Sequence, residues 1–181
     1  VTLATAQTPE EKGMEIAIAA DKADTGWGDS TVDMRMIMTN ANGQTTTREI
    51  RLRNLEVIGD GLGDKSLSIF DTPRDVKGTA FLSHTKVLEA DDQWLLLPAL
   101  GRVKRISSAN KSGPFMGSEF AYEDLSSFEL EKYRFNYIGD EELDGFATYL
   151  VEQVPTDKNS GYTKQLVWLD QQHYRPLKIE F

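Results

Sequence analysis

The chain has 181 residues, of which 20 are lysine or arginine and 29 are aspartate or glutamate, so its formal net charge at pH 7 is −9. This length is sufficient for one domain with a sizeable core, and the acidic balance argues against a protein that binds nucleic acid through its phosphates. The absence of cysteine excludes disulfides and zinc–thiolate sites. The sequence contains no run of about 20 apolar residues, which a membrane-spanning helix would need.

A helix is expected near the N-terminus, over residues 8–23. Thr8 is a suitable N-cap, Pro9 occupies the first helical position, and Glu11 lies where a capping box places its acidic residue. The next turns place three apolar residues on one face: Met14, Ala17 and Ile18. Before this helix, the small residues Ala4-Thr5-Ala6 match the pattern that precedes signal peptidase cleavage, which is consistent with export.

Short strands follow the helix. The Asn42-Gly43 dipeptide is a strong hairpin signal, because both residues tolerate positive φ. Alternating patterns predict strands over residues 30–39, 46–55, 65–71, 79–85, 93–97, 102–107, 132–138, 146–154, 162–170 and 175–181. Strands at this spacing, separated by Gly, Asp or Pro turns, are typical of an antiparallel sheet or barrel.

Three methionines share one face of the strand expected over residues 30–39: Met34, Met36 and Met38. On the neighbouring strand, Ile50 and Leu52 alternate with charged residues and continue an apolar face. Methionine is unbranched and polarisable, so it adapts to irregular surfaces and to flexible ligands. A buried core face and the lining of a ligand cavity have the same pattern, so both interpretations stay open.

The strand expected over residues 93–97 is apolar on both faces. Alternation places Trp94 and Leu96 on one face and Leu95 and Leu97 on the other, which indicates that both faces are covered. On a later strand, Trp168 is expected to face the same interior. The pattern fits either a core packed on two sides or a wall that contacts a ligand.

An unusual loop lies at residues 110–127. Gly113, Pro114 and Gly117 break regular structure beside four large apolar residues: Phe115, Met116, Phe120 and Tyr122. Because loops normally run over the wet surface, these side chains must either pack on the core or close over an apolar ligand. Glycines on both sides of the tip favour a movable lid over a fixed plug, and Ser118 is expected to cap a short helix.

Several segments carry a resemblance to a known family: DDQWLLLPALGRVKRISS and GPFMGSEFAYEDL within residues 91–125, GDKSLSIFDTPRDVKGTAFLSH at 63–84, SGYTKQLVWLD at 160–170 and YRPLKIEF at 174–181. The sequence resembles the LolA-like family of bacterial outer-membrane lipoprotein-sorting proteins. The resemblance implies a mainly β fold, a half-open antiparallel β-barrel of curved sheet with helices on its concave face, as in LolA and LolB. It also implies a periplasmic carrier of lipid or lipoprotein acyl chains.

Within that expectation, residues 1–181 form a single LolA-like domain that lacks the C-terminal strands of the family. An open sheet edge would then invite a homodimer, and an inner-membrane transporter is an expected partner. The related carriers hold their lid closed through an arginine on an early strand, and three candidates exist here: Arg35, Arg51 and Arg53. The expected cavity and lid residues are Met34, Met36, Met38, Ile50, Leu52, Trp94, Leu96, Phe115, Met116, Phe120, Tyr122 and Trp168.

Catalysis has little support in the sequence. His84 and His173 are far apart and neither lies in a metal-ligand spacing, and Ser118 lacks the flanking pattern of a nucleophile elbow. No catalytic residue, metal site or cofactor is therefore expected. Two other functions stay open: a non-enzymatic interaction module of an inner-membrane transporter or envelope complex, and a lipid-acting hydrolase in which a histidine meets a serine and a carboxylate.

Overall fold

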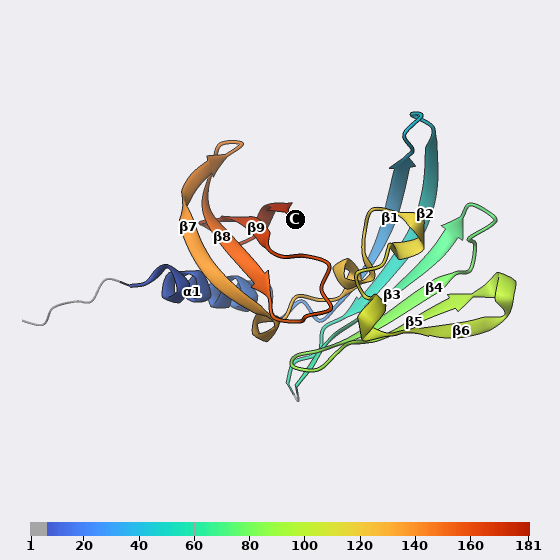
Figure 1. The fold of residues 1–181 in the computed structure, drawn as a ribbon, viewed down its shortest axis with the longest axis horizontal. Coiled ribbons are helices and arrows are strands. Elements are labelled where there is room, and N and C mark those ends of the chain that lie inside the picture. The colour runs from blue at the N-terminus through green and yellow to red at the C-terminus, as the bar shows by residue number, and fades with distance from the viewer. Residues whose placement is uncertain (1–6, 60) are drawn as a thin grey trace, which may run out of the picture. The chain divides into compact units, whose positions relative to one another are not determined.

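The computed structural model describes residues 7–59 and 61–181 and divides into two compact units, each with its own antiparallel sheet (Figure 1). One unit is Gly26–Glu129, and the other combines the N-terminal segment up to Thr25 with Leu130–Phe181. The Ala4-Thr5-Ala6 pattern lies outside the described residues. Within the residues that are described, no helix is long and apolar enough to span a membrane.

The larger unit contains a six-stranded sheet whose strand order follows the chain. Its strands are β1 (Asp29–Thr39), β2 (Thr45–Leu55), β3 (Leu62–Thr72), β4 (Ala80–Lys86), β5 (Asp92–Leu97) and β6 (Arg102–Ile106). Every neighbouring pair is antiparallel, as the alternating sequence patterns predicted. Strand β1 forms one edge of this sheet and β6 forms the other.

The β1–β2 hairpin forms at the predicted turn. The side-chain oxygen of Asn40 accepts hydrogen bonds from the backbone N–H groups of Asn42 and Gln44, at 2.9 and 3.0 Å, and Gly43 adopts a φ of +77°. This turn fixes a register in which Met36 lies opposite Arg48. We call the sheet face that carries Met36 the inner face and the opposite one the outer face.

The smaller unit contains one α-helix and a four-stranded sheet in the order β10-β9-β8-β7. Its elements are α1 (Pro9–Ala23), β7 (Tyr133–Leu143), β8 (Phe146–Pro155), β9 (Gln165–Asp170) and β10 (Pro176–Glu180). The predicted capping box is present, because Thr8 Oγ1 accepts from the Glu11 backbone and the Glu11 carboxylate accepts from the Thr8 backbone.

The buried face of α1 differs from the predicted one. Its buried residues are Gly13, Ile16 and Ala17, whereas Met14 and Ile18 are exposed. The reason is Gly13, because a Cβ atom there would lie only 2.8 Å from the backbone nitrogen of Tyr137 on β7. The missing side chain lets the helix approach the strand closely and rotates its contact face toward Ile16. On the same side, the Lys12 ammonium lies 3.7 Å from the centre of the Tyr137 ring.

The predicted mainly β fold of antiparallel sheets is confirmed, whereas the half-open barrel is not, because the described residues form two separate sheets and neither of them is closed. The chain between β6 and β7 contains only 3-10 turns: Ser108–Asn110, Phe115–Gly117, Tyr122–Leu125 and Leu130–Lys132. With no strand there, β6 and β7 each remain at the edge of a separate sheet. Helix α1 packs against the sheet of the smaller unit, and the apolar residues of the glycine-rich loop pack against the six-stranded sheet.

Replacement of Gly13 by alanine tests the close helix–strand contact. In an exposed helix this change stabilises by up to ~1 kcal/mol, but here the new Cβ meets the β7 backbone. We expect the free energy of unfolding to fall by about 1–3 kcal/mol, as for other overpacked sites. Denaturant titration measures it, with Lys22→Ala on the exposed face of α1 as control. A Gly13→Ala protein as stable as the parent would refute the contact.

Candidate functional site

The inner face of the six-stranded sheet carries a continuous apolar cluster. Its buried members come from all six strands and from the segments that follow β3 and β6: Met36, Ile50, Phe70, Val76, Phe81, Leu95, Ile106 and Phe115. Partly buried side chains extend it: Met34, Met38, Leu52, Leu97, Met116, Tyr122 and Leu125. The methionine face of β1 thus belongs to the same cluster as the apolar residues of the glycine-rich loop.

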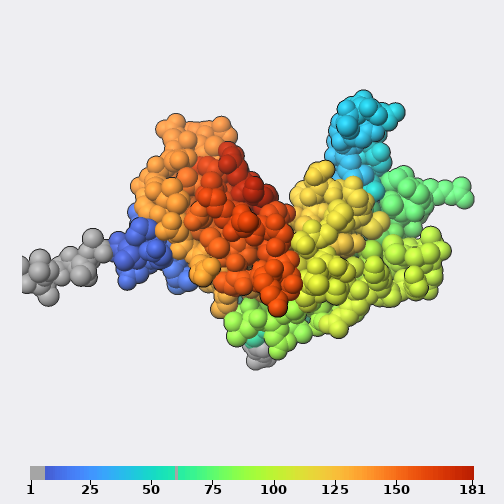
Figure 2. Space-filling model, viewed as in Figure 1, coloured from blue at the N-terminus to red at the C-terminus, as the bar shows by residue number. Residues whose placement is uncertain are grey.

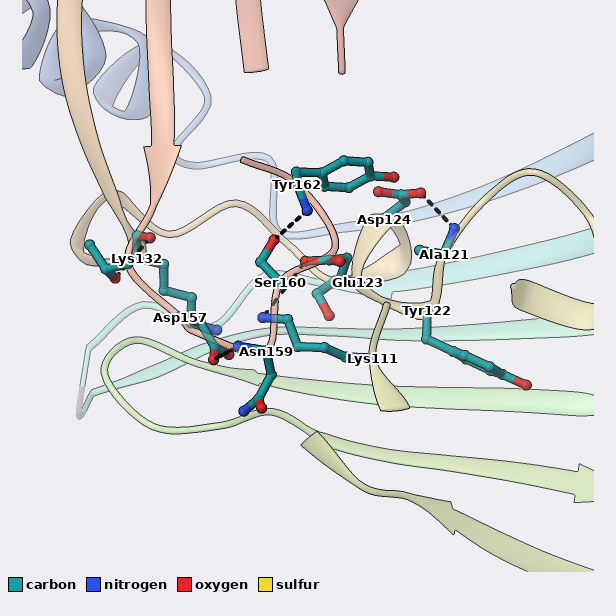
Figure 3. Close-up of polar contacts among 12 residues, drawn as sticks. Lys111, Ala121, Tyr122, Glu123, Asp124, Lys132, Asp157, Asn159, Ser160 and Tyr162 are labelled. Carbon is teal, nitrogen blue, oxygen red and sulfur yellow. Dashed lines mark hydrogen bonds and ion pairs between the residues drawn. The ribbon is translucent and has the colours of Figure 1, made fainter. Parts of the chain in front are cut away.

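Residues 111–127, which we call the covering loop, lie over this inner face. The loop folds back on itself, because the Phe115 backbone donates to the Phe120 carbonyl at 2.6 Å and the Tyr122 backbone donates to the Gly113 carbonyl at 3.2 Å. The Ala121 backbone donates to the Asp124 carboxylate at 2.7 Å, and the Tyr122 side chain points away from this contact (Figure 3). In the space-filling view the yellow atoms of the loop pack against the green strands of this unit (Figure 2).

Phe115 is the side chain that the covering loop buries most completely, with 1% of its surface exposed. Its ring centre lies 5.8 Å from that of Phe70, 5.3 Å from that of Phe81 and 5.6 Å from that of Tyr122. Tilted and edge-on aromatic pairs at these distances are favourable beyond the area that they bury. Burial also raises the pKa of the Tyr122 hydroxyl, so Tyr122 is neutral at physiological pH.

Residues 122–127 form what we call the stem of the covering loop, and residues 113–121 form its tip. Polar contacts attach the stem to a different part of the inner face from the part that lies under the tip. The side-chain amide of the buried Gln93 donates to the Tyr122 carbonyl at 3.1 Å and to the Ser126 hydroxyl at 3.0 Å. The Ser66 hydroxyl donates to the Leu125 carbonyl at 3.3 Å, and the Ser127 backbone donates to the buried Thr85 hydroxyl at 3.2 Å. The inner face therefore has an apolar part under the loop tip and a polar part under the loop stem.

Arg48 on β2 is a site residue that the sequence interpretation missed. Its Nη1 donates to the Met116 carbonyl at 2.8 Å, and its guanidinium carbon lies 5.8 Å from the centre of the Phe70 ring. Met116 has a φ of +51°, a strained region for a residue with a side chain, and this conformation presents its carbonyl to Arg48. Strand alternation contained the signal, since position 48 shares the face of Ile50.

The three arginines considered from the sequence lie on the outer face. Arg35 pairs with Glu49 at 2.9 Å, and Arg51 pairs with Asp71 at 2.6 Å. Arg53 lies opposite Thr31 and Leu67 in the register of the same face. None of the three is therefore placed to contact the covering loop.

Four of the twelve candidate residues fall outside the inner-face cluster. Trp94 and Leu96 project from the outer face, because it is Gln93 and Leu95 that are buried on the inner side of β5. Phe120 sits at the turn of the covering loop and is 52% exposed. Trp168 belongs to the smaller unit, where its indole N–H donates to Glu141 at 2.7 Å and Lys178 lies 4.4 Å from its ring centre.

The outer face has an apolar strip of its own. The register aligns Trp94 with Leu82 and Leu67 across three strands, and Leu96 lies beside Val103, which is 60% exposed. The His84 ring packs edge-on against Trp94 at 5.2 Å. Burial and the neighbouring Lys65 charge both lower the pKa of His84, with burial the larger cause.

The two histidines lie in different units and have different surroundings. His84 lies on β4 of the larger unit, and His173 lies in the smaller unit, where its Nδ1 is 3.1 Å from the Asp170 carboxylate. The contacts of Asp170 run to the backbone of the same turn, at Gln172 and His173. Over residues 7–59 and 61–181, no group of three or more metal-ligating side chains is placed to hold an ion.

Comparisons with known proteins place this architecture among related chains. A family model described as "Uncharacterized protein" matches residues 63–181, and no curated protein matches the sequence. The chain is similar to an outer membrane lipoprotein-sorting protein domain from Vibrio parahaemolyticus, with 66% identity and a TM-score of 0.91 over 95% of this chain and 72% of that one.

Two further structures are similar. A DUF1329 family protein from Desulfovibrio piger is 30% identical, with a TM-score of 0.88 over 96% of this chain and 73% of that one. A LolA superfamily protein from Nitrosomonas europaea is 22% identical, with a TM-score of 0.66 over 93% of this chain and 70% of that one. The last likeness concerns the fold alone.

Truncation of Phe115 tests its place in the inner-face cluster. We expect Phe115→Ala to lower the free energy of unfolding by about 3 kcal/mol, since a buried aromatic side chain leaves a cavity when removed. Phe120→Ala, five residues away on the same loop and exposed, should cost less than ~0.5 kcal/mol. Denaturant titration of both variants checks this, and equal small losses would show that the cluster does not depend on Phe115.

Proposed function

The chain belongs to the LolA-like family, and from this premise we propose that it is a carrier that binds lipid or lipoprotein acyl chains for transfer across the cell envelope. The observation that carries the proposal is the apolar inner face of the six-stranded sheet, with Met36 among its buried residues and the covering loop over it. The name of the Vibrio relative, a lipoprotein-sorting domain, supports this class of cargo.

The proposed architecture of the binding site is the half-open barrel of the family. In it, residues 1–181 belong to a single domain and the inner face forms part of the concave wall. The fold similarity to the LolA superfamily protein supports this arrangement. The proposed wall residues are those that share the inner face: Met34, Met36, Met38, Ile50 and Leu52.

The covering loop is proposed to be the lid of this site. An acyl chain reaches the inner face only after Phe115 withdraws, because that ring occupies the centre of the cluster. Removing the ring from its pocket costs about 3 kcal/mol by analogy with truncation, and each buried methylene contributes ~0.8 kcal/mol. About four buried methylenes would therefore offset the loss, and a long acyl chain has many more.

Arg48 is proposed to hold the lid closed, the role that the resemblance assigns to an early-strand arginine. Its hydrogen bond to the Met116 carbonyl depends on a positive φ at Met116, so the closed loop stores backbone strain of ~1–3 kcal/mol. Release of that strain lowers the cost of opening. Gly117, with a φ of +77°, provides a conformationally free residue directly beside the strained one.

The proposed location is the periplasm, which the name of the Vibrio relative supports because that relative is an outer membrane lipoprotein-sorting domain. An inner-membrane transporter as partner and a homodimer through an open sheet edge are proposals of the same kind. The role is proposed to be non-enzymatic.

A second candidate function is an interaction module of an envelope complex. The observation that favours it is the outer face, where Trp94, Leu96 and Val103 form an apolar strip while the inner face is already packed by Phe115. In that case the partner would bind the outer face and acyl chains would not bind at all. The two functions therefore assign opposite faces of one sheet to the ligand.

Charge substitutions at two adjacent residues of β1, one on each face of the sheet, distinguish between the two proposed functions. Met36→Asp places a carboxylate on the inner face and should abolish uptake of a fluorescent fatty acid, because burying an unpaired charge beside the chain is costly. Ile37→Asp changes the next residue, which is on the outer face and 63% exposed, and should leave uptake unchanged.

Folding of each variant is checked by circular dichroism. Met38→Gln, at a half-buried position of the same cluster, provides a milder change if Met36→Asp does not fold. Normal uptake by folded inner-face variants would contradict the proposed wall.

A further inference from the structure

Arg48 has a buried hydrogen-bond donor that no described residue satisfies. Its Nε–H is enclosed, yet among residues 7–59 and 61–181 it has no hydrogen-bond partner. A buried donor without an acceptor is unfavourable, and more so when it carries charge. Native proteins rarely leave such a group unpaired, so an orphaned one indicates an absent partner or a ligand.

The surroundings of this donor are apolar. Met36 lies opposite Arg48 in the register of β1 and β2, and the Phe70 ring lies beneath the guanidinium at 5.8 Å. Arg48 forms no ion pair in the described part of the chain, whereas Arg35 and Arg51 on the same pair of strands each have a carboxylate partner. Arg48 as a whole is half-buried, and Nε is its enclosed atom. An enclosed donor beside apolar side chains, with no anion from the described residues, fits a ligand that is apolar along its length and carries an oxygen at one end.

The geometry of the guanidinium specifies which oxygens it can bind. Arg51, three residues further along β2, donates from Nε and Nη2 to the two oxygens of Asp71, at 2.6 and 2.9 Å. This edge of the guanidinium matches a carboxylate. In Arg48 it is Nη1 that donates to the loop, at the Met116 carbonyl. Nε lies on the edge of the guanidinium that matches a carboxylate, and this contact leaves Nε for another acceptor.

We propose that Arg48 binds the head oxygen of the acyl ligand through its enclosed Nε–H. This inference rests on the proposed carrier function. The shared chemistry is an oxygen acceptor at the end of a hydrocarbon chain, either the carboxylate of a free fatty acid or the carbonyl of an ester. One side chain then contacts both the lid and the head of the cargo, so it holds the acyl chain with its tail against the methionines of β1.

Three ligands of equal chain length test the proposal: laurate, methyl laurate and dodecane. The full chain is equilibrated with each ligand, and the bound amount is measured by gas chromatography of the extracted protein. We expect laurate to bind at least about tenfold more tightly than dodecane, which is the effect of one good charge-assisted hydrogen bond. Preference for methyl laurate as well would identify the ester carbonyl as an acceptor.

Arg48→Met should reduce this preference to near unity, and Arg48→Lys, which keeps the charge but loses the planar fork, should reduce it in part. Arg53→Met is the matched control, because it makes the same substitution on the same strand at an exposed, outer-face position, and it should retain the full preference.

A measurement on the unsubstituted protein covers the case in which Arg48 variants do not fold. In ¹⁵N-edited NMR spectra, the Arg48 Nε–H proton should move downfield, as for a new hydrogen bond to oxygen, when laurate is added but not when dodecane is added. Equal binding of all three ligands without this downfield movement would overturn the role of Arg48 while leaving the carrier function intact. Failure of every ligand to bind would overturn both.

Discussion

The burial of Phe115 against the inner face is the interaction on which the rest of the larger unit depends. Its ring packs between Phe70, Phe81 and Tyr122, and to reach them the chain must fold back over the sheet. That path requires a positive φ at Met116 and turns its carbonyl toward Arg48. A single aromatic side chain therefore determines where the loop lies, where its backbone is strained and which arginine it meets.

The division of the inner face into an apolar and a polar part explains how one loop can be both attached and movable. Gln93, Ser66 and Thr85 bind backbone atoms and hydroxyls of the loop stem, and a ligand with an apolar chain offers nothing to replace those bonds. The tip is held by dispersion and burial, which an acyl chain beneath it can supply in the same way once the tip closes over that chain. Opening is thus confined by chemistry to the tip, and the stem serves as the fixed point.

Parts of this fold could be read from the sequence because their causes are local. The capping box at Thr8 and the Asn42-Gly43 hairpin depend on neighbours within a few residues, and both were predicted correctly. The methionine face of β1 followed from alternation alone. Trp94 was assigned to the wrong face because β5 is apolar on both sides, so alternation does not say which side faces the loop.

The remaining differences come from contacts between residues distant in sequence. No residue close to Gly13 in sequence requires a glycine at this position of the helix. The close approach of strand β7 explains it. Alternation along β2 placed Arg48 on the inner face, but the carbonyl that accepts its hydrogen bond is 68 residues away in sequence. The two sheets are separate because residues 107–132 contribute no strand to either of them. No local sequence pattern predicts which strands pair.

Hydrogen exchange of the covering loop, followed with and without a bound fatty acid, tests the central claim that this loop is a lid over an acyl-binding face. The informative amides are those of Phe115 and Ser118, which donate to carbonyls within the loop tip itself. The account predicts that without ligand they exchange faster than the amides of β4, because the loop tip opens locally, and that they become protected when the fatty acid is bound. Strong protection equal to that of β4 in both states would contradict it and identify the loop as a permanent part of the core.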